Sequence, residues 1–286
     1  MPIDPQTEVG AVRLAVADLD RARRFYESVI GLAAIESSER EARLGADGVA
    51  LVELVADPDG APRPRGTTGL FHLAVLLPDR AELARSLRRL ADSRWPLAGA
   101  SDHLVSEALY LGDPEANGIE LYRDRPRDEW RRTDRGLEMA TLPLDLESLA
   151  ADADPTDGTP PGVADATRIG HVHIHVADLG AAEEFYAGAL GFEVTVRDYP
   201  GALFLSAGGY HHHIGLNTWA GEGAPPPPPG SLGLRRFEIV VPDEAELERI
   251  RERLSDAGIE PEAGGGGVLA ADPSGNRVLV RSAASG

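Results

Sequence analysis

The chain repeats itself at an offset of 160 residues, and this self-similarity limits its architecture more than any other feature. The segment Val9–Leu19 recurs as Ile169–Leu179, and both copies end in Val-Ala-Asp-Leu. A second segment, Leu77–Leu83, resembles Val241–Leu247. Two kinds of segment that alternate, each present twice, predict four related modules in one chain.

Each module is predicted to begin with a strand, in which apolar residues alternate, and to continue into a helix. Asp18 stands at the strand-to-helix turn of the first module, where its side chain can cap the helix. The helix carries apolar residues at helical spacing and ends near Gly31. Three shorter strands follow, for example at 49–55 and 213–217. The βαβββ order places the modules near 10–56, 69–123, 168–219 and 233–282.

The modules are predicted to form an α+β fold of two domains. Residues 1–132 would hold the first two modules and residues 168–286 the last two, with a helix and linker over 133–167 between them. The linker contains Asp157–Gly162, a segment rich in turn-forming residues. Five consecutive prolines at 225–229 predict a stiff connector between the third and fourth modules.

Composition excludes several classes of function. The absence of cysteine rules out disulfides, zinc–thiolate sites and iron–sulfur clusters. The formal net charge is −19, and an acidic surface repels phosphate backbones, so we expect no nucleic-acid partner. The N-terminal residues show no secretory signal pattern, and no apolar stretch approaches the roughly 18 to 20 residues that span a membrane. We therefore expect a cytoplasmic protein without a membrane partner.

Six of the eight histidines lie in two short segments of the third module, namely His171, His173, His175, His211, His212 and His213. Strand alternation is expected to place the first three on one face, and to place His211 and His213 on the face opposite His212. Imidazoles that converge with carboxylates suit Fe, Mn, Zn or Ni. Two histidines and one carboxylate with open positions suit non-haem Fe(II).

Two motifs carry a resemblance to a known family. The first is G-H-V-H-I-H-V-A-D-L, which begins at Gly170, and the second is D-P-E-A-N-G-I-E-L-Y, which begins at Asp113. Both resemble the vicinal-oxygen-chelate superfamily of glyoxalase I, antibiotic-resistance proteins and type I extradiol dioxygenases. The resemblance implies that paired modules form half-barrels, and that each module can supply one metal ligand from its first strand and one from its last.

The family's ligand positions differ between the modules of this chain. The first-strand positions of modules one to four hold Ala11, His72, His171 and Arg236, and the last-strand positions hold Glu53, Glu120, His213 and Leu279. The outer modules have therefore lost ligands, whereas the second and third modules keep theirs. If these two modules pair around one site, the resemblance implies a metal bound by His72, His171 and Glu120.

The similarity to extradiol dioxygenases extends to residues around the metal. Their pattern H-x-x-S…Y-x-x-D-P…E matches His103, Ser106, Tyr110 and the residues up to Glu120, and their H-H-x-hydrophobic strand matches His212-His213-Ile-Gly-Leu216. The resemblance implies that His213 acts as acid–base catalyst, and that Tyr110 and His103 hydrogen-bond the bound oxygens. The chain departs from the pattern in a gap two residues shorter before Tyr110, and in Ala116, where glycine is usual.

These residues predict an extradiol ring-cleaving dioxygenase that inserts O2 into a catechol-type or hydroquinone-type aromatic. The expected cofactor is Fe(II), with Mn(II) as the alternative. One rival is a glyoxalase I-like lyase using Zn or Ni, in which His213 would be a fourth ligand. Another is a metal-free protein that binds a small molecule. The roles of His173, His175, His211 and His212 stay open, and a homo-oligomer is compatible with the unused outer modules.

Overall fold

The computed structural model describes residues 1–133, 136–153 and 162–283. Apart from Gly162, the predicted linker segment Asp157–Gly162 lies outside the described residues. No helix within the described ranges is long and apolar enough to cross a membrane.

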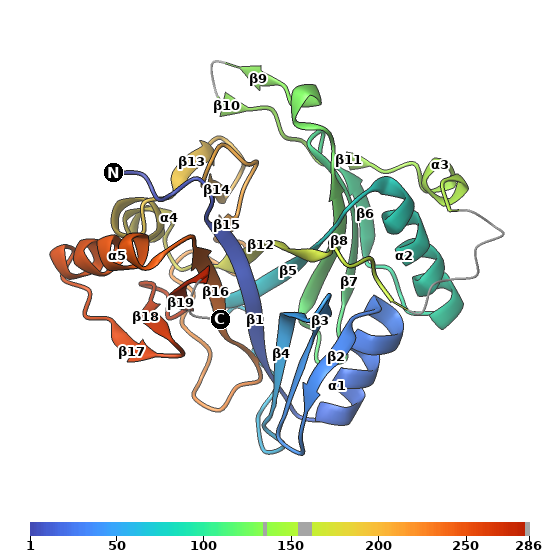
Figure 1. Cartoon of the computed structure of the whole chain (residues 1–286), viewed down its shortest axis with the longest axis horizontal. Coiled ribbons are helices and arrows are strands. Elements are labelled where there is room, and N and C mark those ends of the chain that lie inside the picture. Colours follow the sequence, from blue (N-terminus) through green and yellow to red (C-terminus); the bar gives the residue numbers. More distant parts are fainter. Residues whose placement is uncertain (134–135, 154–161, 284–286) are drawn as a thin grey trace. The chain divides into compact units, whose positions relative to one another are not determined.

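The first two modules both have the predicted order of a strand, a helix and three strands (Figure 1). The first contains β1 Glu8–Val16, α1 Leu19–Phe25, β2 Ala33–Ser37, β3 Glu41–Ala46 and β4 Val49–Ala56. The second contains β5 Gly69–Leu77, α2 Arg80–Ser93, β6 Gly99–Asp102, β7 Ser106–Gly112 and β8 Gly118–Asp124. The short elements after β8 are β9 Arg132–Thr133, β10 Gly136–Leu137, β11 Leu142–Pro143 and α3 Leu146–Ala151.

The third and fourth modules repeat this order. The third contains β12 Arg168–His175, α4 Leu179–Glu183, β13 Glu193–Val196, β14 Ala202–Ser206 and β15 Ile214–Asn217. The fourth contains β16 Gly233–Val241, α5 Glu244–Asp256, β17 Glu262–Gly264, β18 Gly267–Ala271 and β19 Arg277–Ser282. The predicted α+β fold of four βαβββ modules is confirmed.

The chain divides into two compact units. The N-terminal unit comprises Leu14–Gly60 and His72–Ile169, and the C-terminal unit comprises Met1–Arg13, Ala61–Phe71 and Gly170–Gly286. Strands β1, β5 and β12 contribute residues to both units.

Each unit has its own strand order. The orders in the N-terminal unit are β1-β4-β3-β2 and β11-β6-β7-β8-β5, and those in the C-terminal unit are β17-β18-β19-β16 and β12-β15-β14-β13. In three modules the first strand pairs in parallel with the last, as in β5–β8, β12–β15 and β16–β19. A ligand position on a first strand therefore lies beside one on a last strand. The predicted domain limits, 1–132 and 168–286, stay a prediction.

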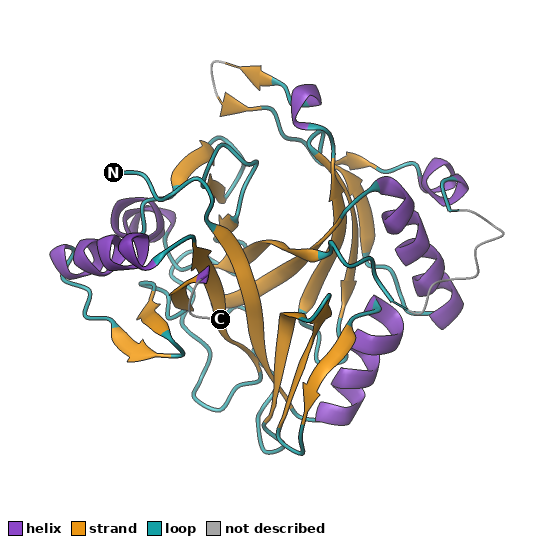
Figure 2. Ribbon diagram, viewed as in Figure 1, coloured by secondary structure: helices purple, strands orange, loops and turns teal. Residues whose placement is uncertain are grey.

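The helices begin where the sequence predicts, because aspartates cap them. The side chain of Asp18 accepts a hydrogen bond from the backbone N–H of Arg21, and Asp178 accepts one from Ala181 in the third module. After α1 the chain makes a π-helical turn over Tyr26–Ile30. This helical segment ends at Gly31, whose φ of 93° is left-handed. Figure 2 shows the helices in purple and the strands in orange.

A buried tyrosine–aspartate bond joins the two modules within each unit. The hydroxyl of Tyr26 donates to Asp113 Oδ2 over 3.1 Å, and Tyr186 donates to Asp272 Oδ2 over the same distance. Both aspartates lie in Asp-Pro turns, which their other carboxylate oxygen closes by accepting backbone N–H groups. Burial raises the pKa of Asp113 and that of Asp272 above their ordinary values.

The raised pKa of Asp113 has a consequence for stability against pH. A carboxyl whose folded-state pKa exceeds its unfolded value of about 3.9 stabilises the fold more as pH falls through the folded pKa. We expect the free energy of unfolding of the wild type, relative to Asp113→Asn, to increase as the pH is lowered from 7 to 4. Urea unfolding at several pH values measures this difference. Asp272→Asn repeats the test at the equivalent Asp-Pro turn of the C-terminal unit. A difference that shrinks as pH falls would contradict the assignment.

Candidate active site

His72 and Glu120 meet on two neighbouring strands of the second module. Strands β5 and β8 run parallel, with His72 opposite Gly118 and Ala74 opposite Glu120. His72 Nε2 lies 2.9 Å from Glu120 Oε2, and the two residues are only 6% and 3% exposed. Burying a carboxylate is costly unless it is paired, so this imidazole and carboxylate form either an ion pair or one side of a cation site.

Tyr110 lies next to this pair and is tied to His103. Tyr110 stands opposite Glu120 in the antiparallel β7–β8 register, and its ring centroid is 5.7 Å from that of His72. His103 Nδ1 is 2.7 Å from the carbonyl oxygen of Ala140, and His103 Nε2 is 2.7 Å from the Tyr110 hydroxyl. A carbonyl only accepts, so Nδ1 carries the proton and Nε2 accepts from the tyrosine. Four predicted site residues therefore lie together in the N-terminal unit.

The segment before Tyr110 is two residues shorter than in the extradiol pattern, but Tyr110 still forms a hydrogen bond with His103. Leu104 adopts a φ of 69°, and the backbone N–H of His103 donates to Ser106 O over 2.8 Å. This tight turn leads directly from β6 into β7. The His103–Tyr110 bond depends on that turn and on Ala140, which lies far along the chain.

His171 lies in the C-terminal unit among other histidines. It is a buried residue of β12, and its ring centroid is 4.1 Å from that of His212 and 6.0 Å from that of His211. His211 Nδ1 and His212 Nδ1 are 2.8 Å apart, so one donates a proton to the other. This bond engages the Nδ1 atom of each of the two rings.

The prediction of a strand over the second histidine segment is wrong. Strand β15 begins at Ile214, so His211, His212 and His213 lie in the loop between β14 and β15. Strand alternation does not apply to a loop, which is why His212 lies beside His171 instead of facing the opposite way. The sequence contained evidence for this arrangement. Aligning H-H-x-hydrophobic with His211-His212-His213-Ile214 puts the apolar Ile214 at the last position and makes His212 the second histidine of the pattern.

His213 is held by one backbone hydrogen bond and by contacts with two aromatic rings. Its Nδ1 accepts a hydrogen bond from the backbone N–H of Ala207 over 3.1 Å, so its proton resides on Nε2. Its ring centroid lies 4.9 Å from that of Tyr210 and 6.4 Å from that of Phe192.

Comparison with known proteins decides the family. The model of the Glyoxalase/Bleomycin resistance protein/Dioxygenase superfamily matches residues 8–121 and 168–280. The chain belongs to this superfamily. A curated relative, the catechol-2,3-dioxygenase of Bacillus subtilis strain 168, is 45% identical over 261 residues, which cover 90% of each chain.

Solved structures share the superfamily fold at low sequence identity. A protein of Bacillus subtilis matches with a TM-score of 0.68 at 11% identity, over 99% of this chain and 86% of its own. Glyoxalase I of Zea mays matches with a TM-score of 0.58 at 16% identity, over 98% of this chain and 94% of its own. The predicted family and fold are thus confirmed.

The positions that the resemblance assigns to ligands in the outer modules are held by buried apolar residues or by residues in ion pairs. Ala11 and Leu279 are buried apolar residues. Arg236 Nη2 lies 3.6 Å from Glu238, and Glu53 Oε1 lies 3.5 Å from Arg43.

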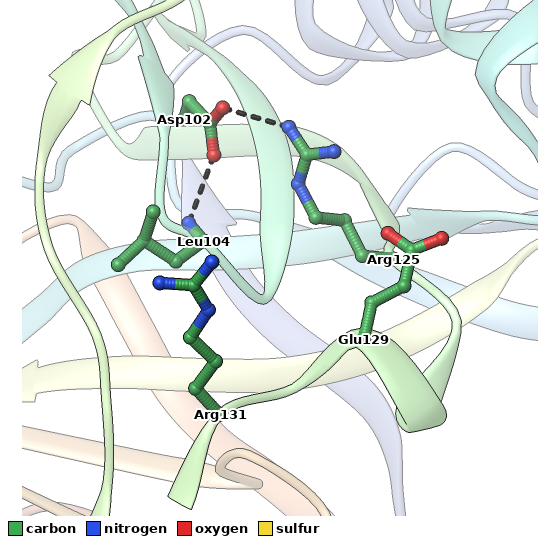
Figure 3. Close-up of a pocket in the computed structure, with 5 residues that line it drawn as sticks. All are labelled: Asp102, Leu104, Arg125, Glu129 and Arg131. Carbon is green, nitrogen blue, oxygen red and sulfur yellow. Dashed lines mark hydrogen bonds and ion pairs between the residues drawn. The ribbon is translucent and has the colours of Figure 1, made fainter.

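A separate cavity of about 420 Å³ lies in the N-terminal unit (Figure 3). It is lined by Asp102, Leu104, Arg125, Glu129 and Arg131. Arg125 Nη2 donates to Asp102 over 2.7 Å and to Glu107 over 3.2 Å. Side chains of both signs line this cavity, and none of the predicted site residues does.

Ala116 has backbone strain that glycine, which stands as Gly275 at the matching position of the repeated Asp-Pro turn, would avoid. Its φ is 63°, in the left-handed region that costs residues with a Cβ about 1 kcal/mol. We expect Ala116→Gly to raise the free energy of unfolding by about 0.5–1 kcal/mol, measured by urea denaturation. Ala108→Gly is the matched control, because Ala108 is buried in β7 and its loss should destabilise the protein. Destabilisation by Ala116→Gly would refute the strain.

Proposed function

We propose that this chain is an extradiol ring-cleaving dioxygenase acting on a catechol-type or hydroquinone-type aromatic and O2. The observation that carries the proposal is the 45% identity to a catechol-2,3-dioxygenase over 90% of both chains. The His72–Glu120 pair beside Tyr110 and His103 supports it, because these are the side chains that the resemblance assigns to ring cleavage.

We propose that His72, Glu120 and His171 hold the metal, since the resemblance assigns the ligand positions to these three residues and all three side chains are buried. Two imidazoles and one carboxylate form the donor set that suits Fe(II), with Mn(II) as the alternative. When bound, such an ion would supply positive charge beside the catechol oxygens, lower their pKa and take part in the reaction with O2.

The protein side chains would handle protons and orientation. His103 Nε2 accepts a hydrogen bond from the Tyr110 hydroxyl, and a phenol oxygen that donates its proton in this way can also accept a hydrogen bond from a catechol hydroxyl. The sequence assigns the acid–base role to His213, and Nε2–H of that ring can donate a proton. We propose His212 Nε2 as the stronger candidate, because the ring of His212 lies beside His171.

Three outcomes separate this function from its rivals. Anaerobic purification, metal analysis and an oxygen electrode with catechol should show Fe(II)- or Mn(II)-dependent O2 uptake and a yellow ring-fission product. Bound Zn or Ni without O2 uptake would favour the glyoxalase I-like lyase. A protein that binds no metal would leave only a small-molecule-binding role. The cytoplasmic location and the oligomeric state stay predictions.

A further inference from the structure

The loop at 207–213 carries His212 and is closed at its two ends. The backbone N–H of Ala207 donates to His213 Nδ1 over 3.1 Å, which joins the first residue of the loop to the last. The carbonyl of His213 accepts a hydrogen bond from the Val172 N–H over 3.1 Å, which ties the loop to β12. These bonds fix the ends of the loop but not the direction of the His212 ring between them.

A threonine on β13 holds the middle of this loop. Thr195 Oγ1 lies 2.7 Å from the carbonyl oxygen of His211 and 3.2 Å from that of Phe204. A hydroxyl has one proton to donate, so the nearer oxygen, that of His211, receives the stronger bond. His211 is fully buried, and its carbonyl therefore depends on a donor from the protein.

Thr195 reaches the loop because β13 contains a bulge. Val194 stands opposite Leu205 and Val196 stands opposite Phe204, so Thr195 is an extra residue in the β13–β14 ladder. A bulged residue leaves the regular alternation of the strand, and its side chain can be directed at a neighbouring segment. Here the bulge directs a hydroxyl at the histidine loop.

The first module has the same bulge but a much shorter connection beside it. Its extra residue is Ile35, which precedes Thr195 by the repeat offset of 160. Residues 47–48 join β3 to β4 in that module, whereas residues 207–213 join β14 to β15. The hydroxyl at the bulge therefore accompanies the longer loop that carries the histidines.

The bond to the His211 carbonyl controls His212 through the peptide that joins these two residues. A peptide unit is planar, so a fixed carbonyl oxygen also fixes the N–H and the Cα of the next residue. From that Cα the His212 ring packs with its centroid 4.1 Å from that of His171 and 4.8 Å from that of Phe204. The same peptide keeps the Nδ1 atoms of His211 and His212 2.8 Å apart.

We propose that Thr195 is a positioning residue that holds His212 in place for proton transfer. This inference rests on the proposed ring cleavage and on the assignment of the proton carrier to His212. Loss of the Thr195 hydroxyl would release the peptide before His212 and let its ring move away from His171. A displacement of about 1 Å at a reacting group can lower a rate by about 100-fold.

The activity test compares Thr195→Val and Thr195→Ser in the Fe(II)-loaded full-length protein with catechol. Valine keeps the shape of threonine without the hydroxyl, so we expect kcat to fall by about 10- to 100-fold while KM stays within about threefold and the iron content is unchanged. Serine keeps the donor, and kcat should stay within about threefold of wild type. Thr68→Val is the matched control, because it removes a buried bond of 2.8 Å from Thr68 Oγ1 to Ser274 O in the same unit and should leave kcat unchanged.

A second readout needs neither metal nor turnover. In metal-free protein with isotope-labelled histidine, the proton between His211 and His212 should give a ring N–H resonance in NMR spectra, because both rings are buried and exchange slowly with water. Its absence from His211→Gln and His212→Gln assigns this resonance. We expect Thr195→Ser and Thr68→Val to keep the resonance and Thr195→Val to lose or shift it.

The two readouts separate this inference from the proposed function. No O2 uptake by the wild type with catechol or hydroquinone would overturn the dioxygenase, while the resonance would still show whether Thr195 fixes the histidine pair. A resonance that Thr195→Val leaves unchanged would overturn the positioning role. So would an unchanged kcat in Thr195→Val, or an equal fall of kcat in Thr68→Val.

Discussion

Glu120→Gln should lower both the affinity for iron and the O2 uptake with catechol by on the order of 1000-fold. The substitution keeps the shape of the side chain but removes the negative charge of the proposed donor set. A buried carboxylate next to a dication contributes several kcal/mol, and about 1.4 kcal/mol corresponds to each tenfold change. Metal analysis after gel filtration and an oxygen electrode measure the two effects.

The control for this substitution is Glu129→Gln, which removes the same charge from an exposed carboxylate. It should leave iron content and O2 uptake unchanged. The Glu120 carboxylate faces His72 in a buried pair, so its loss could affect folding. Circular dichroism checks that the Glu120→Gln protein stays folded. A folded Glu120→Gln protein with full iron content would show that the metal lies elsewhere.

His212→Gln should lower kcat by about 100- to 10,000-fold while the protein keeps its metal, because general acid–base catalysis contributes that range. Glutamine can still hydrogen-bond but cannot exchange a proton near neutral pH. His213→Gln should have the smaller effect, since this ring packs on Tyr210 and its Nδ1 serves the backbone of Ala207. The opposite order of effects would restore the assignment that the sequence made to His213.

The iron content of both variants decides how a loss of activity is interpreted. A fall in kcat at constant iron content indicates the loss of a proton carrier. A parallel fall of both would mean that the histidine is a ligand, as the lyase alternative assigns to His213. The dependence of kcat on pH gives a further check, because a lost acid or base removes one limb of a bell-shaped profile.

The modules and the ligand types could be predicted because they depend on local chemistry. Asp18 and Asp178 cap their helices whatever surrounds them, so the repeat predicts each strand-to-helix turn. His72 and Glu120 stand on strands with regular alternation, and parallel pairing of β5 with β8 brings them together. Within a regular strand, the position of a residue determines the direction of its side chain.

The loops could not be predicted in this way. His211, His212 and His213 lie in a segment without strand geometry, so alternation assigned them to the wrong faces. Likewise, the partner of His103 Nδ1 is the carbonyl of Ala140, and a backbone carbonyl has no side-chain signature in the sequence.

The sequence by itself determined the four modules, because they follow from periodicity, and its resemblance to the superfamily gave the family and the His and Glu residues proposed to bind a metal. Only the tertiary structure decided which histidine ring lies beside His171, and that Phe71 joins Trp219 in one aromatic surface. Residues 71 and 219 are far apart along the chain. Their contact depends on how the backbone packs, and no local preference encodes it.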